Sequence, residues 1–308
     1  MKKENIDLSI IILSYNTREF LKKCLASVFK AEKNKYQIEV VVVDNASTDG
    51  SIIFLKKLLK AKRNKLKVIF SERNLGFAGG NNLGLKSAKG KYILFLNSDT
   101  EIKPQAFFKS LNFMESHPDA GALTPKTMLF SGQMDPDCHR GFPTPWASLT
   151  YFFGLEKIFP KSKTFGQYHQ NYLNLNQVHE IDAGFGTFLL TRKETLKEVG
   201  GWDEEYFFYG EDLDLFYRIK KAGRKVYFLP EVLVIHHKGG SSGLRKESRK
   251  KAKVDSQTSL KAAQASIRAM EIFYRKFYQD KYPGWLNFIV LLGIKTKGFF
   301  RVLLYKAK

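Results

Sequence analysis

The first hundred residues alternate between two patterns of hydrophobic positions. Four continuous apolar runs are typical of strands buried on both faces of a sheet, at Leu8–Leu13, Ile38–Val43, Leu66–Phe70 and Tyr92–Leu96. After each of the first two runs, apolar residues recur at helical spacing, at Leu21, Cys24, Leu25 and Val28 and then at Ile52, Leu55 and Leu59. Repeated strand–helix units predict an α/β fold with a mainly parallel sheet and right-handed crossovers.

The remainder of the chain is less regular. Residues Pro125–Gln177 are aromatic, proline-rich and weakly periodic. Order returns with a strand at Gly186–Thr191, a helix from Glu211 to Lys221 and strands at Lys225–Leu229 and Val232–Ile235. Basic amphipathic helical patterns follow. We predict a main domain over residues 1–243, with halves of about 1–125 and 126–243, and a basic amphipathic helical extension over residues 244–308.

Polar residues follow each of the four early strands. The strand ends are Ser14-Tyr15-Asn16, Asp44-Asn45, Arg73-Asn74 and Asn97-Ser98-Asp99. Because the carboxyl ends of parallel strands meet at one edge of a sheet, and ligands bind there, we expect a polar crevice at that edge. No G-x-G-x-x-G follows the first strand, and no Gly-Lys-Ser/Thr occurs beside the later glycines, which excludes the dinucleotide fingerprint and the P-loop.

The segment Arg73–Gly84 is rich in glycine and asparagine. We interpret it as a turn. Glycine lets a ligand approach the backbone, and asparagine offers both donors and acceptors, so this segment suits ligand binding. A nucleotide is a ligand that suits these groups. A flexible loop with no ligand is the alternative.

Asp99 stands between the fourth strand and Pro104, which fits the first turn of a helix. One interpretation is a turn-forming acid ahead of that helix. The other is a ligand for a hard cation, because Mg²⁺ and Mn²⁺ prefer oxygen and often take one or two carboxylates plus substrate phosphates. The local sequence leaves both open.

The sequence Glu211-Asp212-Leu213-Asp214 places three acids at the start of a predicted helix. Asp212 shares a face with Leu215 and Phe216, whereas Glu211 and Asp214 point elsewhere. Asp214 can pair with Arg218, four residues later. Asp212 therefore either stabilises the helix terminus or is a partly buried general base aimed at the crevice.

His236 and His237 end the last predicted strand. Since neighbouring strand residues face opposite sides, one of the two points toward the ligand side, where a neutral imidazole can complete a metal shell. A Gly/Ser run follows, with Arg245 and Lys246 beyond it. Our hypothesis is that residues 239–246 form a lid that covers phosphates and keeps water out.

Together these motifs resemble the inverting family 2 glycosyltransferases, in particular the rhamnosyltransferase-like branch that builds bacterial surface polysaccharides. The matching pieces, in the family's order between residues 8 and 243, are SIIILSYN, VVVDNASTDGS, NLGFAGGNNLG, YILFLNSDTEI, GGWDEEYFFYGEDLDLFYRIKKAG and VIHHKGGSS. The resemblance implies a GT-A fold, which is Rossmann-like, a nucleoside-diphosphate sugar as donor, and a divalent metal, Mg²⁺ or Mn²⁺.

The resemblance also implies residue roles. Asp212 matches the general base, and Asp99 and His236 match metal ligands. The positions implied for the nucleotide sugar are Tyr15, Asn16, Asp44, Asn74, Gly79, Asn82, Asn97 and Ser98, with Asn97 standing where many relatives have aspartate. The positions implied for acceptor contacts are Trp202, Asp203 and Glu211.

Charge adds a partner. The chain carries a formal net charge of +21, and residues Gly243–Lys308 hold 16 Lys/Arg against 4 Asp/Glu. Such a segment attracts anionic lipid head groups, a phosphorylated acceptor or nucleic acid. Trp285–Ile294 and Phe299–Tyr305 either pack on the main domain or lie on a membrane surface. We favour the membrane, because family acceptors are often lipid-linked.

We therefore predict an inverting enzyme that moves rhamnose or another hexose to a hydroxyl of a glycan or polyprenyl-linked acceptor. The alternatives are a sugar nucleotidyltransferase, which would not need the Glu-Asp helix, and a basic nucleic-acid-binding protein, although no nucleic-acid module matches. Two cysteines exclude a disulfide framework, and no apolar run reaches the length of a membrane span. The N-terminal run is predicted to be a strand rather than a signal peptide. We expect a cytoplasmic protein, peripheral on the inner face of the cell membrane.

Overall fold

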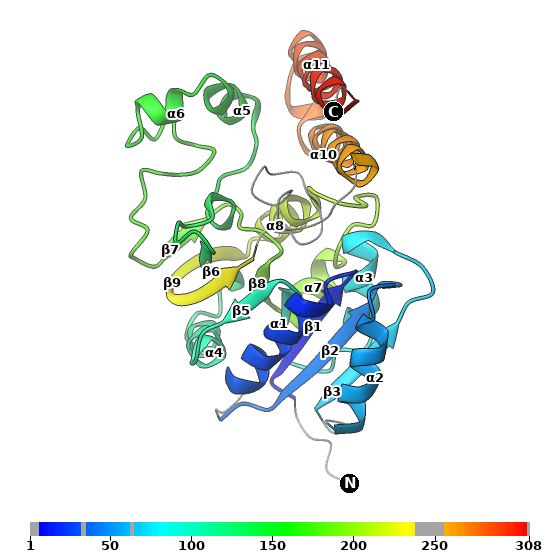
Figure 1. The fold of residues 1–308 in the computed structure, drawn as a ribbon. Helices are drawn as coiled ribbons and strands as arrows, with labels where there is room; N and C mark the ends of the chain where they lie inside the picture. Colours follow the sequence, from blue (N-terminus) through cyan, green and yellow to red (C-terminus); the bar gives the residue numbers. More distant parts are fainter. Residues whose placement is uncertain (1–5, 32–34, 62–64, 238–255, 307–308) are drawn as a thin grey trace.

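A single sheet organises the protein. The computed structural model describes residues 6–31, 35–61, 65–237 and 256–306, and within them nine strands form one sheet in the order β3-β2-β1-β4-β8-β6-β9-β5, with β7 beside β9 (Figure 1). The strands are β1 Leu8–Ser14, β2 Ile38–Asp44, β3 Leu66–Phe70, β4 Tyr92–Asn97, β5 Thr100–Ile102, β6 Ala120–Leu129, β7 His179–Ile181, β8 Phe188–Arg192 and β9 Lys225–His236.

Parallel pairing holds throughout the first half of the sheet, β3-β2-β1-β4. In the second half β6 and β9 are parallel, whereas β8, β5 and β7 run antiparallel to their neighbours. The prediction of an α/β fold with a mainly parallel sheet is confirmed. One continuous sheet joins the two predicted halves, because β4 pairs directly with β8.

Two layers of helices cover the sheet. The α-helices of the described residues are α1 Arg18–Ala31, α2 Ser51–Ala61, α3 Gly76–Leu85, α4 Ala106–Ser116, α5 Pro145–Phe152, α6 Leu155–Ile158, α7 Lys193–Val199, α8 Glu211–Lys221, α10 Ser256–Phe277 and α11 Gly284–Lys306. Helices α1, α2 and α4 lie on one face of the sheet, and α3, α7 and α8 lie on the other. Alternate strand residues face opposite layers, so Ile10 and Ile12 pack with α1, α2 and α4, and Ile11 packs with α3, α7 and α8. This two-sided burial explains the continuous apolar runs.

The glycine-rich segment is a helix, α3, so its interpretation as a turn is wrong. The reason is close packing. A Cβ on Gly80 would lie 2.4 Å from Leu13 Cδ1, and one on Gly84 would lie 2.5 Å from Ile11 Cγ2. Glycine is needed at these two positions so that α3 can lie against β1, despite its low helix propensity.

Two further boundaries differ from the prediction. The strands predicted at Lys225–Leu229 and Val232–Ile235 are one strand, β9, in which a register shift absorbs the residues around Pro230. Pro104 lies outside α4, because Gln105 adopts a left-handed conformation (φ 66°) and the helix begins at Ala106. The predicted helix Glu211–Lys221 and the strand Leu66–Phe70 are confirmed at both ends.

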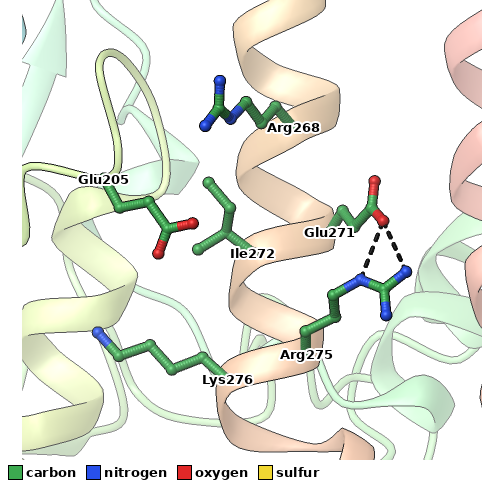
Figure 2. Close-up of a pocket in the computed structure, with 6 residues that line it drawn as sticks. All are labelled: Glu205, Arg268, Glu271, Ile272, Arg275 and Lys276. Carbon is green, nitrogen blue, oxygen red and sulfur yellow. Dashed lines mark hydrogen bonds and ion pairs between the residues drawn. The ribbon is translucent and has the colours of Figure 1, made fainter.

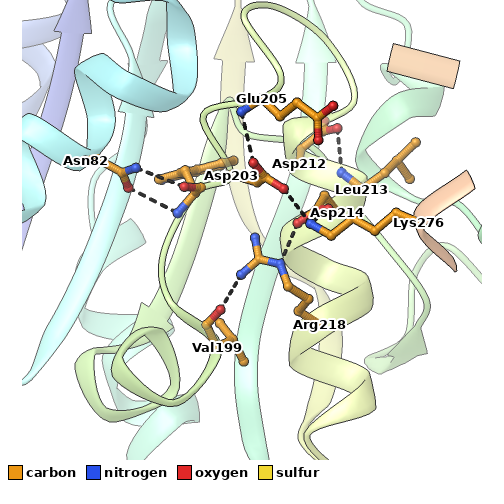
Figure 3. A network of polar contacts seen from close by, with 10 residues as sticks. Asn82, Val199, Asp203, Glu205, Asp212, Leu213, Asp214, Arg218 and Lys276 are labelled. Atoms are coloured by element: carbon orange, nitrogen blue, oxygen red, sulfur yellow. Dashed lines mark hydrogen bonds and ion pairs between the residues drawn. The ribbon is translucent and has the colours of Figure 1, made fainter. Parts of the chain in front are cut away.

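The C-terminal helices α10 and α11 form a hairpin that packs on the main domain. Aromatic residues of α10, including Phe273 and Tyr274, form a third core with Tyr206 and the inner face of α11. A buried ionic network adds to it: Asp214 accepts bonds from Arg218 Nε at 2.5 Å and from Lys276 Nζ at 2.6 Å (Figure 3). Helical structure is thus confirmed for the described part of the extension. No helix in the described ranges has the length and apolarity of a membrane span.

Substitution of Asp214 by alanine is expected to lower the free energy of unfolding by about 3 kcal/mol or more, since it leaves the Arg218 and Lys276 cations without their shared carboxylate. Urea unfolding followed by circular dichroism measures this loss. Glu271→Ala is the control, because it breaks an exposed pair with Arg275 within α10 and should cost less than about 1 kcal/mol. Equal losses for the two variants would contradict the prediction.

Candidate active site

The carboxyl ends of β1, β2 and β4 meet as predicted. Ser14 lies opposite Asp44, and Leu13 lies opposite Asn97. A chain of hydroxyl groups then links the ends of β1 and β4: Thr17 Oγ1 lies 3.0 Å from Ser14 Oγ and 2.8 Å from Ser98 Oγ. These contacts fix the two loops that carry half of the predicted nucleotide-binding residues.

Asp44 is the most deeply buried of the predicted ligand-binding residues. Its Oδ1 accepts a bond from Ser47 N at 2.9 Å. Its Oδ2 is buried and has no hydrogen-bond partner among the described residues. A buried acceptor without a partner is costly, so it is suited to a donor supplied by a ligand.

The loop after β1 is held against the loop after β2. Asn16, in a left-handed conformation (φ 53°), donates its N–H to Ser47 Oγ at 2.9 Å and accepts from Thr48 N at 2.7 Å. Tyr15 beside it is exposed at the same edge. An exposed aromatic ring beside a buried unpartnered acceptor can stack on a base.

Asn45 was named in the sequence analysis as part of a polar strand end, but its structural role was not predicted. Its Nδ2 donates to Asn74 Oδ1 at 2.9 Å and to Gly76 O at 3.1 Å, and its Oδ1 accepts from Leu75 N at 2.9 Å. Asn45 therefore fastens the end of β2 to the start of α3. Asn74 lies in this turn, and its Oδ1 also accepts from Gly76 N. The signal in the sequence that could have indicated this role is the position of Asn45 directly after Asp44, at the end of an apolar run.

Gly79 and Asn82 have structural contacts. Gly79 approaches Leu75 Cβ, which a Cβ on Gly79 would meet at 3.1 Å. Asn82 Nδ2 donates to Trp202 O at 2.9 Å, and its Oδ1 accepts from Trp202 N (Figure 3). Its Nδ2 also donates to Glu204 Oε1 at 2.8 Å. These contacts account for both residues without a ligand, and their nucleotide contact stays a prediction.

Asp99 and His236 lie together although they are far apart in sequence. Antiparallel pairing of β5 with β9 sets Thr100 opposite His236, which leaves Asp99 Oδ1 3.3 Å from His236 Nε2. The other ring nitrogen, Nδ1, lies 3.5 Å from Asp135 Oδ2. All three side chains are buried. The sequence placed the first two in one site and missed Asp135.

Burial and charge oppose each other in this cluster. Burial disfavours ionisation of Asp99, but His236 outweighs it and holds the pKa of Asp99 below its usual range. Burial likewise disfavours the imidazolium, but Asp99 and Asp135 raise the pKa of His236 to about 9. Two buried carboxylates around one imidazole thus favour a positive charge between them.

These residues fit a divalent cation. A carboxylate oxygen and an imidazole nitrogen are ligands that Mn²⁺ accepts, and Asp135 is placed to orient the ring of His236, as carboxylates do for metal-bound histidines. Within the described ranges, no cluster of three or more His, Cys, Asp or Glu side chains is arranged to hold a metal ion. Asp99 and His236 would therefore need further ligands, such as phosphate oxygens and water.

Asp212 is held by an arginine that the sequence analysis missed. Arg140 Nη2 donates to Asp212 Oδ2 at 2.8 Å, and its Nε and Nη2 also donate to Gly184 O at 3.0 and 2.9 Å. Asp212 Oδ1 accepts from Leu213 N at 2.7 Å. Its side chain is 15% exposed, so the carboxylate is fixed in direction and still reaches the surface.

The orientation predicted for the neighbours of Asp212 is wrong. Glu211 and Asp214 are more deeply buried than Asp212. The C-terminal hairpin contributes to the burial of Asp214, because α10 covers this end of α8: Lys276 contacts Asp214, and a Cβ on Gly210 would lie 2.9 Å from Ala269 Cβ. The predicted pairing of Asp214 with Arg218 is confirmed.

Burial first, and the charge of Asp212 second, raise the pKa of Glu211 to about 8. Because the ordinary pKa of glutamate is lower, the folded state keeps a proton over a range in which the unfolded chain has released it. Stability from this group is therefore lost as the pH rises from about 4.5 to about 8. Glu211→Gln removes that loss.

The free energy of unfolding of Glu211→Gln, relative to the unsubstituted protein, is expected to rise between about pH 5 and pH 8 by on the order of 1 kcal/mol or more. Urea titrations of both proteins at the two pH values measure it. A difference that does not change with pH would show that Glu211 is ionised in the folded protein throughout.

Trp202 and Asp203 occupy different environments. Trp202 is buried beneath the site, with its ring edge-on to Phe77 and Phe95 at centroid distances of 5.2 and 4.9 Å. Asp203 is half-buried and contacts Lys276 of α10 (Figure 3). An acceptor contact is therefore easier for Asp203 than for Trp202, and both stay predictions. The lid hypothesis for residues 239–246 concerns residues outside the described ranges.

A surface hollow separates the loop after Trp202 from α10 (Figure 2). It is lined by Glu205, Arg268, Glu271, Ile272, Arg275 and Lys276. Arg275 is paired with Glu271 at 2.9 Å, so the hollow has mixed charge. None of the predicted site residues lines it.

Comparisons with known proteins show the family of this chain. The family model for glycosyl transferase family 2 matches residues 9–194, more than half of the chain. An N-acetylglucosaminyl-diphospho-decaprenol L-rhamnosyltransferase of Mycobacterium tuberculosis is 27% identical over 77% of this chain and 78% of its own length. The poly(ribitol-phosphate) β-N-acetylglucosaminyltransferase TarS of Staphylococcus aureus is 36% identical over 35% of this chain and 19% of its own.

Solved structures share the fold. GalNAc-T7 with UDP, GalNAc and Mn²⁺ superposes with a TM-score of 0.61 at 19% identity, over 88% of this chain and 48% of its own. The mannosyltransferase PcManGT of Pyrobaculum calidifontis, with GDP-Man and Mn²⁺, gives 0.58 at 15% identity, over 99% and 74%. This chain thus spans about half the length of the first of these. The family match does not support the two alternative predictions, a sugar nucleotidyltransferase and a nucleic-acid-binding protein. The chain belongs to glycosyl transferase family 2 and is a glycosyltransferase with a GT-A fold.

Proposed function

We propose that this enzyme moves a sugar from a nucleoside-diphosphate sugar to a hydroxyl of a glycan or lipid-linked acceptor in bacterial cell-surface polysaccharide synthesis, with inversion at the anomeric carbon. The observation that carries the proposal is the arrangement of two carboxylate sites around the ends of the strands. Asp99 lies beside His236, and Asp212 is held by Arg140. One site suits a cation and its diphosphate, and the other suits a base.

Asp99 and His236 would hold Mg²⁺ or Mn²⁺. The cation would supply positive charge to the diphosphate as it leaves. Asp44, Tyr15 and Asn16 lie where the nucleoside would bind, since they occupy the ends of β1 and β2, and Ser98 and Asn97 stand between them and Asp99. The structures of GalNAc-T7 and PcManGT, which contain Mn²⁺ with a nucleotide, support this assignment.

Asp212 is the proposed base. It removes the proton from the acceptor hydroxyl as that oxygen forms a bond to the anomeric carbon, and the bond to the diphosphate breaks with its electron pair. Arg140 fixes Oδ2 of Asp212, so the carboxylate is oriented before the acceptor arrives. A single displacement of this kind inverts the anomeric centre.

Rhamnose, carried by deoxythymidine diphosphate, is the donor sugar that we favour. The rhamnosyltransferase of M. tuberculosis supports this donor, because its alignment with this protein covers most of both chains. Its name specifies a diphospho-decaprenol acceptor, which supports a lipid-linked acceptor here. TarS, whose name specifies poly(ribitol phosphate), supports a polymer acceptor as the alternative.

A thermal-shift panel tests the donor and the metal. Nucleoside diphosphates and nucleotide sugars are added one at a time, each with Mn²⁺, with Mg²⁺ and with a chelator. Because a ligand that binds only the native state raises the melting midpoint, we expect a rise for a nucleotide that is larger with a divalent cation than without. No rise with any nucleotide would contradict the proposal.

The outer face of α11 is the proposed membrane contact. Its exposed apolar residues recur at helical spacing, at Trp285, Phe288, Ile289, Leu292, Phe299, Phe300 and Leu303, and no acidic residue follows Asp280. A basic helix with one exposed apolar face binds anionic bilayer surfaces. Phe288→Glu with Leu292→Glu should reduce co-sedimentation with vesicles that contain phosphatidylglycerol, and equal co-sedimentation would refute this contact. Such binding would place the enzyme on the inner face of the cell membrane.

A further inference from the structure

A second exposed apolar surface lies far from α11 in sequence. It is formed by α5, Gly154 and α6, and we call residues 145–159 the α5–α6 tip. The exposed fractions of Phe152, Phe153 and Ile158 are 68%, 64% and 65%. Trp146, Leu149 and Phe159 are exposed on the same segment. Large side chains gathered in this way on a surface mark a binding site.

The tip is held in place by a helix cap and by a buried hydrogen bond. Thr144 caps α5 by accepting a bond from Ala147 N at 3.1 Å, and Ala147 and Thr150 face inward. Glu156 is buried and accepts a bond from His169 Nδ1 at 2.7 Å. The small and polar residues thus point to the protein and the large apolar residues point outward. This is the reverse of the usual pattern for a helix on a protein surface.

The exposed charges within the tip and just after it in the sequence have one sign. Lys157 lies in the tip, Lys161 and Lys163 follow it, and Glu156 is the only acidic residue between Asp137 and Glu180. Since Glu156 is buried, it adds no negative charge to the exposed surface. Apolar and aromatic groups surrounded by lysines match the boundary between the head groups and acyl chains of an anionic bilayer.

The tip and α11 lie at the same end of the molecule. In Figure 1, β1 and β2 point toward this end, with α5 and α6 on one side of it and α10 and α11 on the other. In the same view α8, whose first turn contains Asp212, lies between the sheet and this end. A flat surface that touched both the tip and α11 would therefore lie across the end of the molecule toward which β1 and β2 point.

We infer that the α5–α6 tip is a second membrane-contacting element, which enters the head-group region of an anionic bilayer together with α11. The inference rests on the proposed membrane contact of α11. Contact at two points orients the protein, so the site faces the surface in which a lipid-linked acceptor lies. A second copy of this chain is a poorer occupant, because a two-fold interface would bring identical lysine clusters together.

Tryptophan fluorescence tests the tip directly. The chain has three tryptophans, and Trp202 is buried while Trp146 and Trp285 are exposed on the two surfaces. In the full-length Trp285→Phe protein, Trp146 is the one exposed reporter. With phosphatidylglycerol vesicles that contain brominated acyl chains, we expect quenching of Trp146 emission and a blue shift. Emission that stays unchanged while the protein binds the vesicles would overturn the inference.

A substitution gives a second test. Phe153→Glu with Ile158→Glu should weaken vesicle binding by about tenfold or more, because two apolar contacts are replaced by charges that anionic lipid repels. Ile53→Glu on α2, which is equally exposed, is the matched control and should leave binding unchanged. Melting midpoints and the nucleotide-induced shift of each variant verify folding and the donor site. Binding that falls equally with Ile53→Glu would overturn the inference.

The outcomes separate this inference from the proposed function. Loss of binding in the α11 variant alone would leave the membrane contact standing and overturn the role of the tip. Absence of any nucleotide-induced shift would contradict the donor proposal without affecting vesicle binding. Sedimentation velocity without lipid distinguishes self-association, and a dimer that dissociates in the tip variant and binds no vesicles would assign the tip to a second copy.

Discussion

Asp212→Asn is expected to reduce the rate of sugar transfer by about 100- to 10,000-fold, the contribution of a general base. Asparagine keeps one oxygen, which can accept the bond that Arg140 donates to Oδ2 of Asp212, but it cannot take the proton of an acceptor hydroxyl. The loss should therefore appear in kcat, while the affinity for the nucleotide sugar is retained. Single-turnover transfer measures the first quantity, and calorimetric titration measures the second.

Two comparisons make this result specific. Asp119→Asn carries the same chemical change on an exposed residue paired with Lys225, and it should leave transfer unchanged. Glu211→Gln distinguishes the role of Glu211 from that of Asp212. Because the pKa of about 8 keeps Glu211 protonated near neutral pH, it is not the expected base there. If Glu211→Gln abolished transfer and Asp212→Asn did not, the base would be Glu211, and Asp212 would serve only to neutralise Arg140.

Asp99→Asn is expected to reduce transfer by about 100-fold or more and to remove most of the dependence of nucleotide binding on a divalent cation. The amide keeps the size of the side chain but loses the charge that attracts the cation. Calorimetric titration of a nucleoside diphosphate, with and without Mn²⁺, measures the effect independently of activity. In the unsubstituted protein, Mn²⁺ should bind weakly alone and well with the nucleotide.

Asp135→Asn is the graded comparison. Asp135 contacts the ring of His236 on the side away from Asp99, so it would act by orienting the ring. A change of this kind costs about 10- to 100-fold in metal affinity. Nucleotide binding that depends on Mn²⁺ equally in all three proteins would remove Asp99 and His236 from the metal site.

Several features of the fold could be predicted from residues close together in the chain. The strands β1 to β4 are continuous apolar runs because both faces of the sheet are covered, and α8 has an apolar stripe bounded by Gly210 and Gly223. The segment from Gly76 to Leu85 could not be predicted in this way. Its glycines disfavour a helix locally, and only close packing on β1 makes them necessary.

Some residues of the candidate site could likewise be predicted from the sequence, and others could not. The strand-end argument predicted that Asp44 and Asp99 lie at one edge of the sheet, and the family resemblance added Asp212 and His236 to the predicted site. Arg140 and Asp135 come from the aromatic, weakly periodic region after β6, which has no local pattern to mark them. The environment of Asp214 also depends on α10, which supplies Lys276 from a distant part of the sequence.

The sequence by itself determined the strands β1 to β4 and the helices α1, α2 and α8, the polar motifs at the ends of those strands, and the positive charge of the C-terminal region. These properties follow from the spacing of apolar residues, the turns between them and composition. The tertiary structure alone decided that Asp135 supports His236, that Arg140 holds Asp212, and that two separate apolar surfaces share one end of the molecule. Such contacts join residues far apart in the chain, and packing brings them together.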